Sequence, residues 1–457
     1  MSFRVLARAA ALALSACAAA HATTFEVDTG TDTVDAHPGD GACADAEGHC
    51  SLRAAIIETN ALAGEDRIEL PAGTFLFAIA GEGEDAAGAG DLDITDDVAI
   101  EGAGSDATAI DAGALDRVFE IFSGPGTRTV AFSHLTVRNG FIHDTGLGAG
   151  GAGLRIDALA HVALEDVVIR DNRADFSFSG IAIDTQGCVE GSRVRILDNV
   201  DAAETGSGMA VAAVHAYGAS EADSSACFTL EDSEISGNRA DQAGAIESEF
   251  APITLKRTLV SDNEARFAGA IVANIAADTL LENVTISGNR GDPGAILNDG
   301  FSHLTIVNST ITGNRGVFGQ PIVGGIQDVH GGFGLTFLAN TILHGNGPGF
   351  IADDCDRATS SGGNMVGDSA RCHFDVDPTD QLDVDPGLSP LADHGGFTWT
   401  HLPGPAAIDR GLDAGCVPTD QRGVPRPIDG DGDGTATCDA GAVEIVREAI
   451  FANGFDG

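Results

Sequence analysis

The sequence predicts an all-β protein whose body is a right-handed parallel β-helix, in which short strands coil and stack on copies of themselves. Three observations lead to this fold class. An apolar residue followed three positions later by asparagine recurs seven times between residues 169 and 346. A second signature, Gly-Ala-Ile or Gly-Gly-Ile, recurs within the same repeats. The chain also contains 61 glycines and only 5% aromatic residues, which favours many turns over a conventional packed globule.

Residues 1–22 are expected to be a secretory signal peptide. Two arginines precede an apolar stretch of small residues, and Ala20-His21-Ala22 fits the A-x-A cleavage pattern. The alternative is a lipoprotein signal, because Leu14-Ser15-Ala16-Cys17 resembles a lipobox. Ordinary secretion is favoured, since cleavage at Cys17 would leave a short apolar region. No other run approaches the length of a membrane-spanning helix, so we expect a secreted or cell-surface protein without a membrane span.

Residues 23–105 are expected to form an N-terminal cap and the first coils, because a solenoid leaves open edges that need covering. Residues 51–63 read as a helix, and Ser51 is suited to be its N-cap. Short strands are expected at residues 25–27, 68–70 and 75–77.

Residues 106–346 are expected to be the stacked coils. The asparagines are separated by 27, 39, 25, 26, 25 and 32 residues, and three near-equal spacings in a row indicate one structural unit repeated. Between them lie short alternating segments such as Leu304-Thr305-Ile306, which are typical of strands. Asparagine at one fixed corner can stack from coil to coil at the cross-strand spacing of about 4.8 Å. The predicted asparagine ladder comprises Asn172, Asn199, Asn238, Asn263, Asn289 and Asn314, with Asn346 ending the series.

The cysteines predict an oxidising compartment. Removal of the signal leaves eight, an even number that indicates four disulfides; zinc is the competing reading, but no C-x-x-C occurs. Cys188 and Cys227 each lie eight residues before a repeat isoleucine, so stacking would bring their Cα atoms within disulfide range. The predicted pairs are Cys43–Cys50, Cys188–Cys227, Cys355–Cys372 and Cys416–Cys438.

The repeat signature ends after Asn346. Residues 347–446, in which Pro, Asp and Cys rise, are expected to be a C-terminal cap with two local disulfides. Residues 447–457 read as a loosely held tail.

The formal charge of −45 argues against nucleic acid or anionic lipid as a partner, because both require cationic patches. It favours divalent cations or neutral sugars. The expected partner is an extracellular polysaccharide or a host or cell-surface glycan. We also expect the protein to be a monomer.

At both ends the chain resembles known families of secreted bacterial proteins. The stretch Cys50 to Ile56 (CSLRAAI), followed by Asn60, is similar to the CSLREA motif, although Ala54 stands where the family usually has Glu. The segments Asp385 to Gly396, Pro405 to Asp409, Thr419 to Gly423 and Gly441 to Glu444 resemble the choice-of-anchor Q domain. The repeats resemble the pectin-lyase-like superfamily and polymorphic outer-membrane proteins, which are adhesins. These resemblances imply surface exposure or secretion and transfer no catalytic residues.

Carboxylates recur at one outward position that follows the second signature of each coil. Counting along each strand gives Asp157, Asp184, Ala212, Glu249, Asn274 and Asp299 in one column. Arg155 and Glu247, two residues earlier in their coils, also point outward. Stacked carboxylates repel one another unless protonated, hydrogen-bonded or bridged by a cation. The candidate catalytic residues are therefore Asp157, Asp184, Glu249, Asp299 and Arg155, although any solenoid must also present polar residues to water.

A second acidic feature is the run Asp429-Gly430-Asp431-Gly432-Asp433-Gly434. Its alternation matches the first half of an EF-hand-like loop, so Asp429, Asp431 and Asp433 are candidate ligands for a structural Ca²⁺. The Glu expected at loop position twelve is replaced by Ala440, which leaves a plain acidic turn as the alternative.

These observations favour a non-catalytic surface protein in adhesion or glycan binding. The alternative is a polysaccharide lyase or glycoside hydrolase that acts through the carboxylate column. A purely structural envelope component is a third reading.

Overall fold

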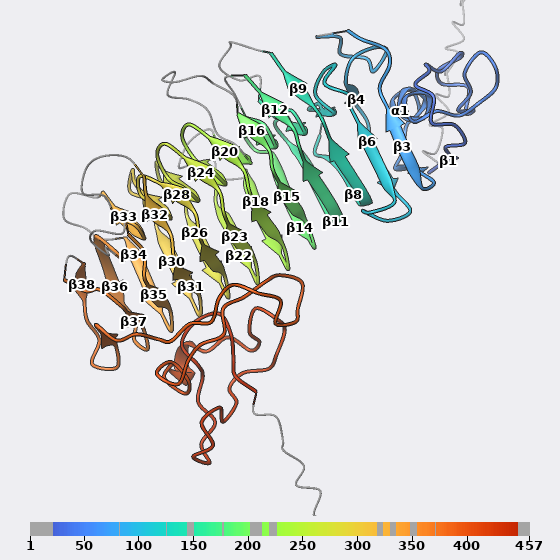
Figure 1. The fold of residues 1–457 in the computed structure, drawn as a ribbon. Helices are drawn as coiled ribbons and strands as arrows, with labels where there is room; N and C mark the ends of the chain where they lie inside the picture. The colour runs from blue at the N-terminus through green and yellow to red at the C-terminus, as the bar shows by residue number, and fades with distance from the viewer. Residues whose placement is uncertain are drawn as a thin grey trace, which may run out of the picture.

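The computed structural model describes residues 22–81, 83–124, 126–143, 150–175, 178–201, 213–218, 226–317, 323–329, 335–347, 354–370 and 372–446. In these residues short parallel strands stack coil upon coil into one elongated parallel β-helix (Figure 1). The predicted all-β fold class is confirmed. The predicted signal peptide and C-terminal tail fall almost entirely outside the described residues and stay predictions.

The strands form three sheets that run along the axis of the helix. The long sheet contains β1 (Thr24–Glu26), β2 (Asp66–Glu69), β3 (Gly73–Leu76), β5 (Val98–Glu101), β6 (Thr108–Asp111), β8 (Arg128–Arg138), β11 (Ala160–Arg170), β14 (Cys188–Ser192), β15 (Arg195–Leu197), β18 (Cys227–Glu231), β19 (Glu234–Ser236), β22 (Ile253–Lys256), β23 (Leu259–Ser261), β26 (Thr279–Glu282), β27 (Thr285–Ser287), β30 (Leu304–Val307), β31 (Thr310–Thr312), β34 (Thr336–Ala339), β35 (Ile342–His344), β36 (Arg357–Ser360), β37 (Met365–Val366), β38 (His373–Asp375) and β39 (Gln381–Leu382). The nine-stranded sheet contains β4 (Leu92–Ile94), β7 (Phe119–Ile121), β10 (Leu154–Ile156), β13 (Ile181–Ile183), β17 (Val214–Tyr217), β21 (Ile246–Glu249), β25 (Ile271–Asn274), β29 (Ile296–Asn298) and β33 (Ile326–Asp328). The seven-stranded sheet contains β9 (Phe141–Ile142), β12 (Arg173–Ala174), β16 (Val200–Asp201), β20 (Arg239–Ala240), β24 (Glu264–Ala265), β28 (Arg290–Gly291) and β32 (Arg315–Gly316).

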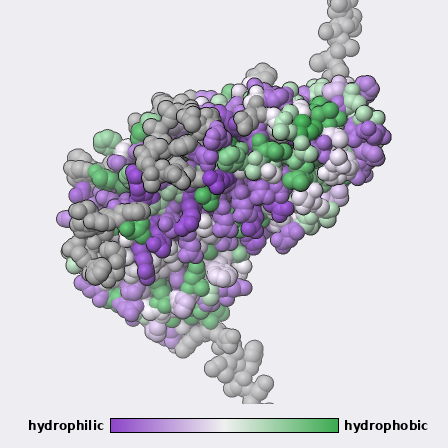
Figure 2. Space-filling model, turned by 45° about the horizontal axis from the view of Figure 1, so that its top comes forward, coloured by the Kyte–Doolittle hydropathy of each residue, from purple (hydrophilic) through white to green (hydrophobic). Residues whose placement is uncertain are grey.

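The core is built from like residues stacked on one another. Ile246, Ile271 and Ile296 pair in register between successive coils, and all three are fully buried. Full burial of each such side chain contributes roughly 1.5–3 kcal/mol. Many outward residues are polar, and the face shown in Figure 2 is mostly hydrophilic wherever it is coloured.

The asparagine ladder forms at the corner between the long and the seven-stranded sheets. At each step the backbone N–H and the side-chain amide both donate to the Oδ1 of the next asparagine, as from Asn238 to Asn263 at 3.0 and 2.9 Å. The same pattern runs from Asn172 through Asn346. The ladder ends on Asp354, which the sequence did not indicate; its Oδ1 accepts both bonds from Asn346, at 3.0 and 2.9 Å.

The N-terminal cap contains the predicted helix, α1 (Leu52–Ala61), slightly shorter than the expected 51–63. Ser51 is its N-cap, and the Ser51 Oγ accepts a 3.0 Å hydrogen bond from the Ala54 N–H. The expected short strands lie at β1, β2 and β3, each shifted by one or two residues. No helix among the described residues combines the length and apolarity that crossing a membrane requires.

Four disulfides join the pairs that the sequence predicts: Cys43–Cys50, Cys188–Cys227, Cys355–Cys372 and Cys416–Cys438. Cys188 and Cys227 are register partners in β14 and β18, with their Cα atoms 4.5 Å apart. This bridge therefore staples the coils that flank the longest repeat.

The C-terminal region differs from the expected end cap. The long sheet continues beyond residue 346 to β39, so the coils do not stop where the asparagine signature stops. Residues 384–446, drawn orange to red in Figure 1, then lie along the side of the long sheet. Their contacts are specific: the Thr285 hydroxyl donates to Gln421 Oε1 (2.6 Å), and the Ala442 N–H donates to Thr310 Oγ1 (3.0 Å).

Candidate functional site

The outward face of the nine-stranded sheet carries the candidate site. Alternate residues of a strand point to the same side, and the parallel register aligns one such residue from every coil. The first outward column consists of Asp93, Glu120, Arg155, Ala182, His215, Glu247, Val272, Leu297 and Gln327. The second outward column lies two residues farther along the chain and includes Asp157, Asp184, Tyr217, Glu249, Asn274 and Asp299.

All five predicted candidates lie in these two columns: Arg155 in the first, and Asp157, Asp184, Glu249 and Asp299 in the second. Ala212, which the repeat count also assigned to the second column, lies outside the described residues. The strand of that coil is β17, so His215 and Tyr217 occupy the two outward positions. The count failed there because this coil lacks the Gly-Ala-Ile signature and belongs to the longest repeat.

The first strands of the sheet bring together three carboxylates, which we call the carboxylate cluster: Asp91, Asp93 and Glu120. One oxygen from each lies within 4.8 Å of the others. The Arg117 Nε is 2.8 Å from Asp91 Oδ2 and 3.3 Å from Glu120 Oε2. Burial raises the pKa of Asp91 to about 8 and that of Asp93 to about 7, and it also raises the pKa of Glu120.

Arg155 links this cluster to the next coils. Its Nε is 3.2 Å from both Glu120 Oε1 and Asp157 Oδ1, and its guanidinium reaches Asp184 at 3.8 Å. Burial raises the pKa of Asp157. Arg155 thus balances part of the repulsion among the stacked carboxylates.

Aromatic rings occupy the middle of the face. The rings of Phe178 and His215 are stacked, with centroids 3.8 Å apart and planes 5° apart. Tyr217 continues the row, with its ring centroid 6.3 Å from that of His215. Burial lowers the pKa of His215 to about 4, so this imidazole is neutral at physiological pH.

Two glutamates follow the aromatic row on β21. Glu247, the register partner of His215, is only 3% exposed, and Glu249 is the register partner of Tyr217. Burial, with a smaller contribution from Glu249, raises the pKa of Glu247 to about 8; burial also raises the pKa of Glu249. Asn274 Nδ2 lies 3.5 Å from the Glu249 carboxylate. The pair therefore places a protonated acid beside a second carboxyl group.

Replacement of Glu247 by glutamine is expected to change how stability depends on pH. The folded protein keeps this proton up to about pH 8, whereas the unfolded chain loses it near the ordinary pKa of 4.5. Wild-type stability is therefore lost as the pH rises between these values, while Glu247→Gln has no proton to lose at this position. The free energy of unfolding would be measured with urea at pH 5 and at pH 8. From pH 5 to pH 8, that of Glu247→Gln should rise by a few kcal/mol relative to that of wild type. Glu190→Gln, at an exposed position, is the control. If the free energy of unfolding of Glu247→Gln depends on pH as that of wild type does, the raised pKa of Glu247 is wrong.

The acidic turn at residues 429–434 is arranged differently from the prediction. Asp429 and Asp431 have carboxylate oxygens near Asp409, which the sequence did not indicate, whereas Asp433 is not in this group. Both oxygens of Asp429 accept backbone bonds, from Gly432 N–H (2.6 Å) and Gly434 N–H (3.0 Å). These bonds are those of an acidic turn, the alternative left open above; calcium at this turn stays a prediction.

Sequence reasoning missed Asp91, Asp93, Glu120 and Arg117. The first coils carry neither the asparagine nor the Gly-Ala-Ile signature, so no count extended to them. The alternation in Asp91-Leu92-Asp93-Ile94, with acids between buried apolar residues, is the signal that could have found the cluster.

A family model described as right handed beta helix region matches residues 179–366. This match agrees with the predicted hand of the coil and with the resemblance to pectin-lyase-like proteins. No curated protein matches the chain.

Proposed function

We propose that this protein is a secreted or surface-exposed protein that binds a neutral polysaccharide along the outward face of the nine-stranded sheet. A β-helix of this kind fits a surface or glycan-related protein. The disulfides agree with an extracellular location.

The row of Phe178, His215 and Tyr217 is the observation that carries the proposal. The ring of Phe178 stacks on that of His215, and Tyr217 lies at the other outward position of the same strand, β17, which is one step of a ladder that runs along the molecule. Aromatic rings offer apolar faces to sugars, while neighbouring polar groups fix orientation. Asn274 lies near the row and offers a hydrogen-bond donor, and Glu249 and Asp184 offer acceptors.

Glycan cleavage is a second candidate, favoured by Glu247 and Glu249. Glycosidases use one carboxyl group that is protonated at working pH and one that is ionised. The raised pKa of Glu247, about 8, provides the first of these. Arg155 lies three coils earlier in the first outward column, next to Asp157 rather than next to these glutamates.

Tyr217→Ala is expected to weaken polysaccharide binding about tenfold, since loss of one stacking ring costs roughly 1.4 kcal/mol. Purified mature protein would be screened against neutral and acidic polysaccharides by affinity electrophoresis, with reducing ends and unsaturated products measured in parallel. Trp399→Ala is the matched control, because Trp399 is 56% exposed and belongs to residues 384–446, which contact the long sheet.

Each outcome of the screen has a clear meaning. In the first outcome, a polysaccharide retains the protein without new chain ends, Tyr217→Ala weakens the retention and Trp399→Ala does not. This outcome supports binding by this face. Cleavage that Glu247→Gln abolishes replaces binding with catalysis as the function. Equal losses in the two aromatic variants, or no retention of any polysaccharide, overturns the proposal.

A further inference from the structure

We propose that Asp91, Asp93 and Glu120 form a binding site for a calcium ion at the N-terminal end of the β-helix. This site is separate from the calcium predicted at residues 429–433, and it does not depend on glycan binding.

The ligand set suits a hard divalent cation. The three carboxylates come from neighbouring parallel strands, β4 with the residue before it and β7, and one oxygen of each lies within 4.8 Å of the others. They offer only oxygen, which Ca²⁺ prefers, and its flexible coordination tolerates spacing set by a β-ladder.

Asp93 provides the second, independent observation. Its side chain is fully buried, and its Oδ2 accepts a 2.7 Å hydrogen bond from the Ala87 N–H. The other oxygen, Oδ1, is buried without a hydrogen-bond partner among the described residues. A buried carboxylate oxygen without a partner is costly, and a bound cation would compensate for it.

The charges around the cluster also favour a bound cation. Arg117 makes ion pairs with Asp91 and Glu120, and Arg155 with Glu120, but no ion pair to Asp93 occurs among the described residues. Glu84 and Asp85 add further negative charge near Asp93. Carboxylates therefore outnumber the two guanidinium groups around the cluster, and a divalent cation would offset part of the excess negative charge.

The N-terminal helix holds the loop that presents these ligands. The Arg53 guanidinium donates to the carbonyl oxygens of Ala87 (2.9 Å), Gly90 (2.8 Å) and Asp91 (3.2 Å). The Asn60 side-chain amide donates to the Asp93 carbonyl at 2.7 Å. The backbone on either side of the two aspartates is thus fixed before any ligand binds, which reduces the ordering cost of binding.

Gly90 allows the same loop to turn tightly and to pass close to the Gly81 backbone. Its φ is +67°, and a Cβ at this position would lie 1.9 Å from the Gly81 carbonyl oxygen and 2.6 Å from Asp116 Oδ2. Only glycine fits, so the turn that delivers Asp91 to the cluster depends on it.

The test is calcium binding to the chelator-treated mature protein, measured by calorimetry and by thermal unfolding. Wild type is expected to bind one Ca²⁺ at this site with a Kd of roughly 0.1–1 mM and to gain about 2–3 °C in Tm at 10 mM Ca²⁺. Asp93→Asn should lose both effects. Its Tm without calcium should equal or exceed that of wild type, because one buried charge has been removed.

Asp429→Asn is the matched control, since it removes a carboxylate from the other acidic group and should retain binding. Glu120→Gln, altered at a half-buried position, replaces Asp93→Asn if the latter does not fold. No calcium binding by wild type up to 10 mM overturns the proposal. Binding that Asp429→Asn abolishes and Asp93→Asn retains also overturns it, in favour of the C-terminal turn.

Discussion

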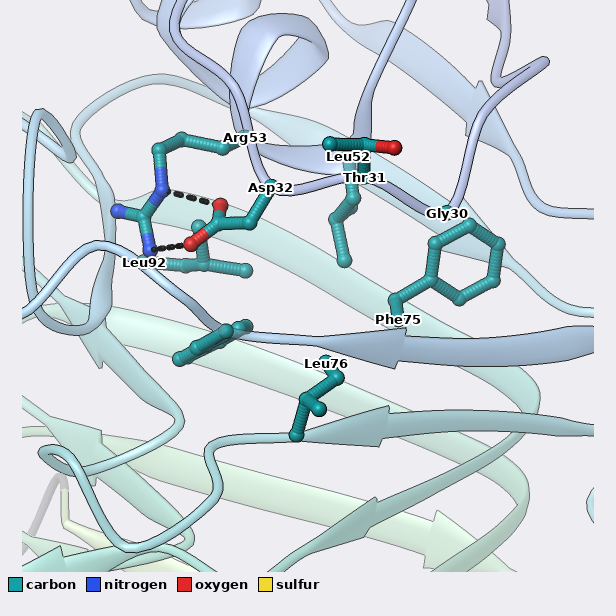
Figure 3. A pocket seen from close by; sticks show the side chains of 9 residues that line it. Gly30, Thr31, Asp32, Leu52, Arg53, Phe75, Leu76 and Leu92 are labelled. Carbon is teal, nitrogen blue, oxygen red and sulfur yellow. Dashed lines mark hydrogen bonds and ion pairs between the residues drawn. The ribbon is translucent and has the colours of Figure 1, made fainter.

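Replacing Arg53 by methionine is expected to lower the free energy of unfolding by about 4 kcal/mol, the cost of breaking a buried ion pair. The Arg53 Nε donates to Asp32 Oδ1 at 2.6 Å, and both side chains are buried (Figure 3). The same guanidinium binds three backbone carbonyls and stacks on Phe77, with Cζ 5.3 Å from the ring centroid. Methionine fills similar volume but leaves the Asp32 charge and these carbonyls without their partner.

The measurement is urea unfolding followed by circular dichroism. Arg67→Met is the control, because its ion pairs with Glu69 and Glu101 are exposed and contribute at most about 1 kcal/mol. Limited proteolysis should also show new cleavage between residues 78 and 95, the segment that Arg53 and its partner Asp32 hold. If Arg53→Met unfolds like Arg67→Met, the guanidinium is not the anchor of this cap.

Asn263→Ala, in the middle of the asparagine ladder, is expected to cost about 3 kcal/mol. The Asn263 Oδ1 accepts from the backbone and the side chain of Asn238, and its amide donates to Ile235 O and Asn289 Oδ1. All of these groups are buried, and each one left without a partner costs about 1–3 kcal/mol. Partial relaxation reduces the sum.

Thermal and urea unfolding would measure this loss, with Asn274→Ala as the control. Asn274 lies on the outward face, half-buried, with one long contact to Glu249. Its truncation should cost less than about 1 kcal/mol. Equal losses in the two variants would mean that the ladder contributes no more than a surface amide.

The repeats, the ladder and the cysteine pairs could be predicted from the sequence because each depends on a local pattern at constant spacing. Cys188 and Cys227 illustrate this, since the same offset from a repeat isoleucine places them in register. The resemblances of the two ends to CSLREA and choice-of-anchor Q proteins stay predictions.

The site could be predicted only in part. Five candidates were assigned to the outward columns from the repeat count. Asp93 and Glu120 belong to coils without a repeat signature, so the sequence gives no offset from which their strand register could be counted. His215 and Tyr217 were missed because the long repeat shifted the residue count in their coil. The lateral position of residues 384–446 depends on contacts such as Thr285 with Gln421, which are 136 residues apart and follow no periodic pattern.

The end of the ladder at Asp354 bears on fibre growth. An asparagine at the last step would turn an amide donor toward a further coil, whereas a carboxylate only accepts. Asp354 is fully buried and uses one oxygen for Asn346 and the other for the Asp368 N–H, at 2.8 Å. The buried amide column therefore closes inside the molecule and offers no template to a second chain. At this end of the long sheet, end-to-end polymerisation would have to begin on the backbone edge of β38 and β39.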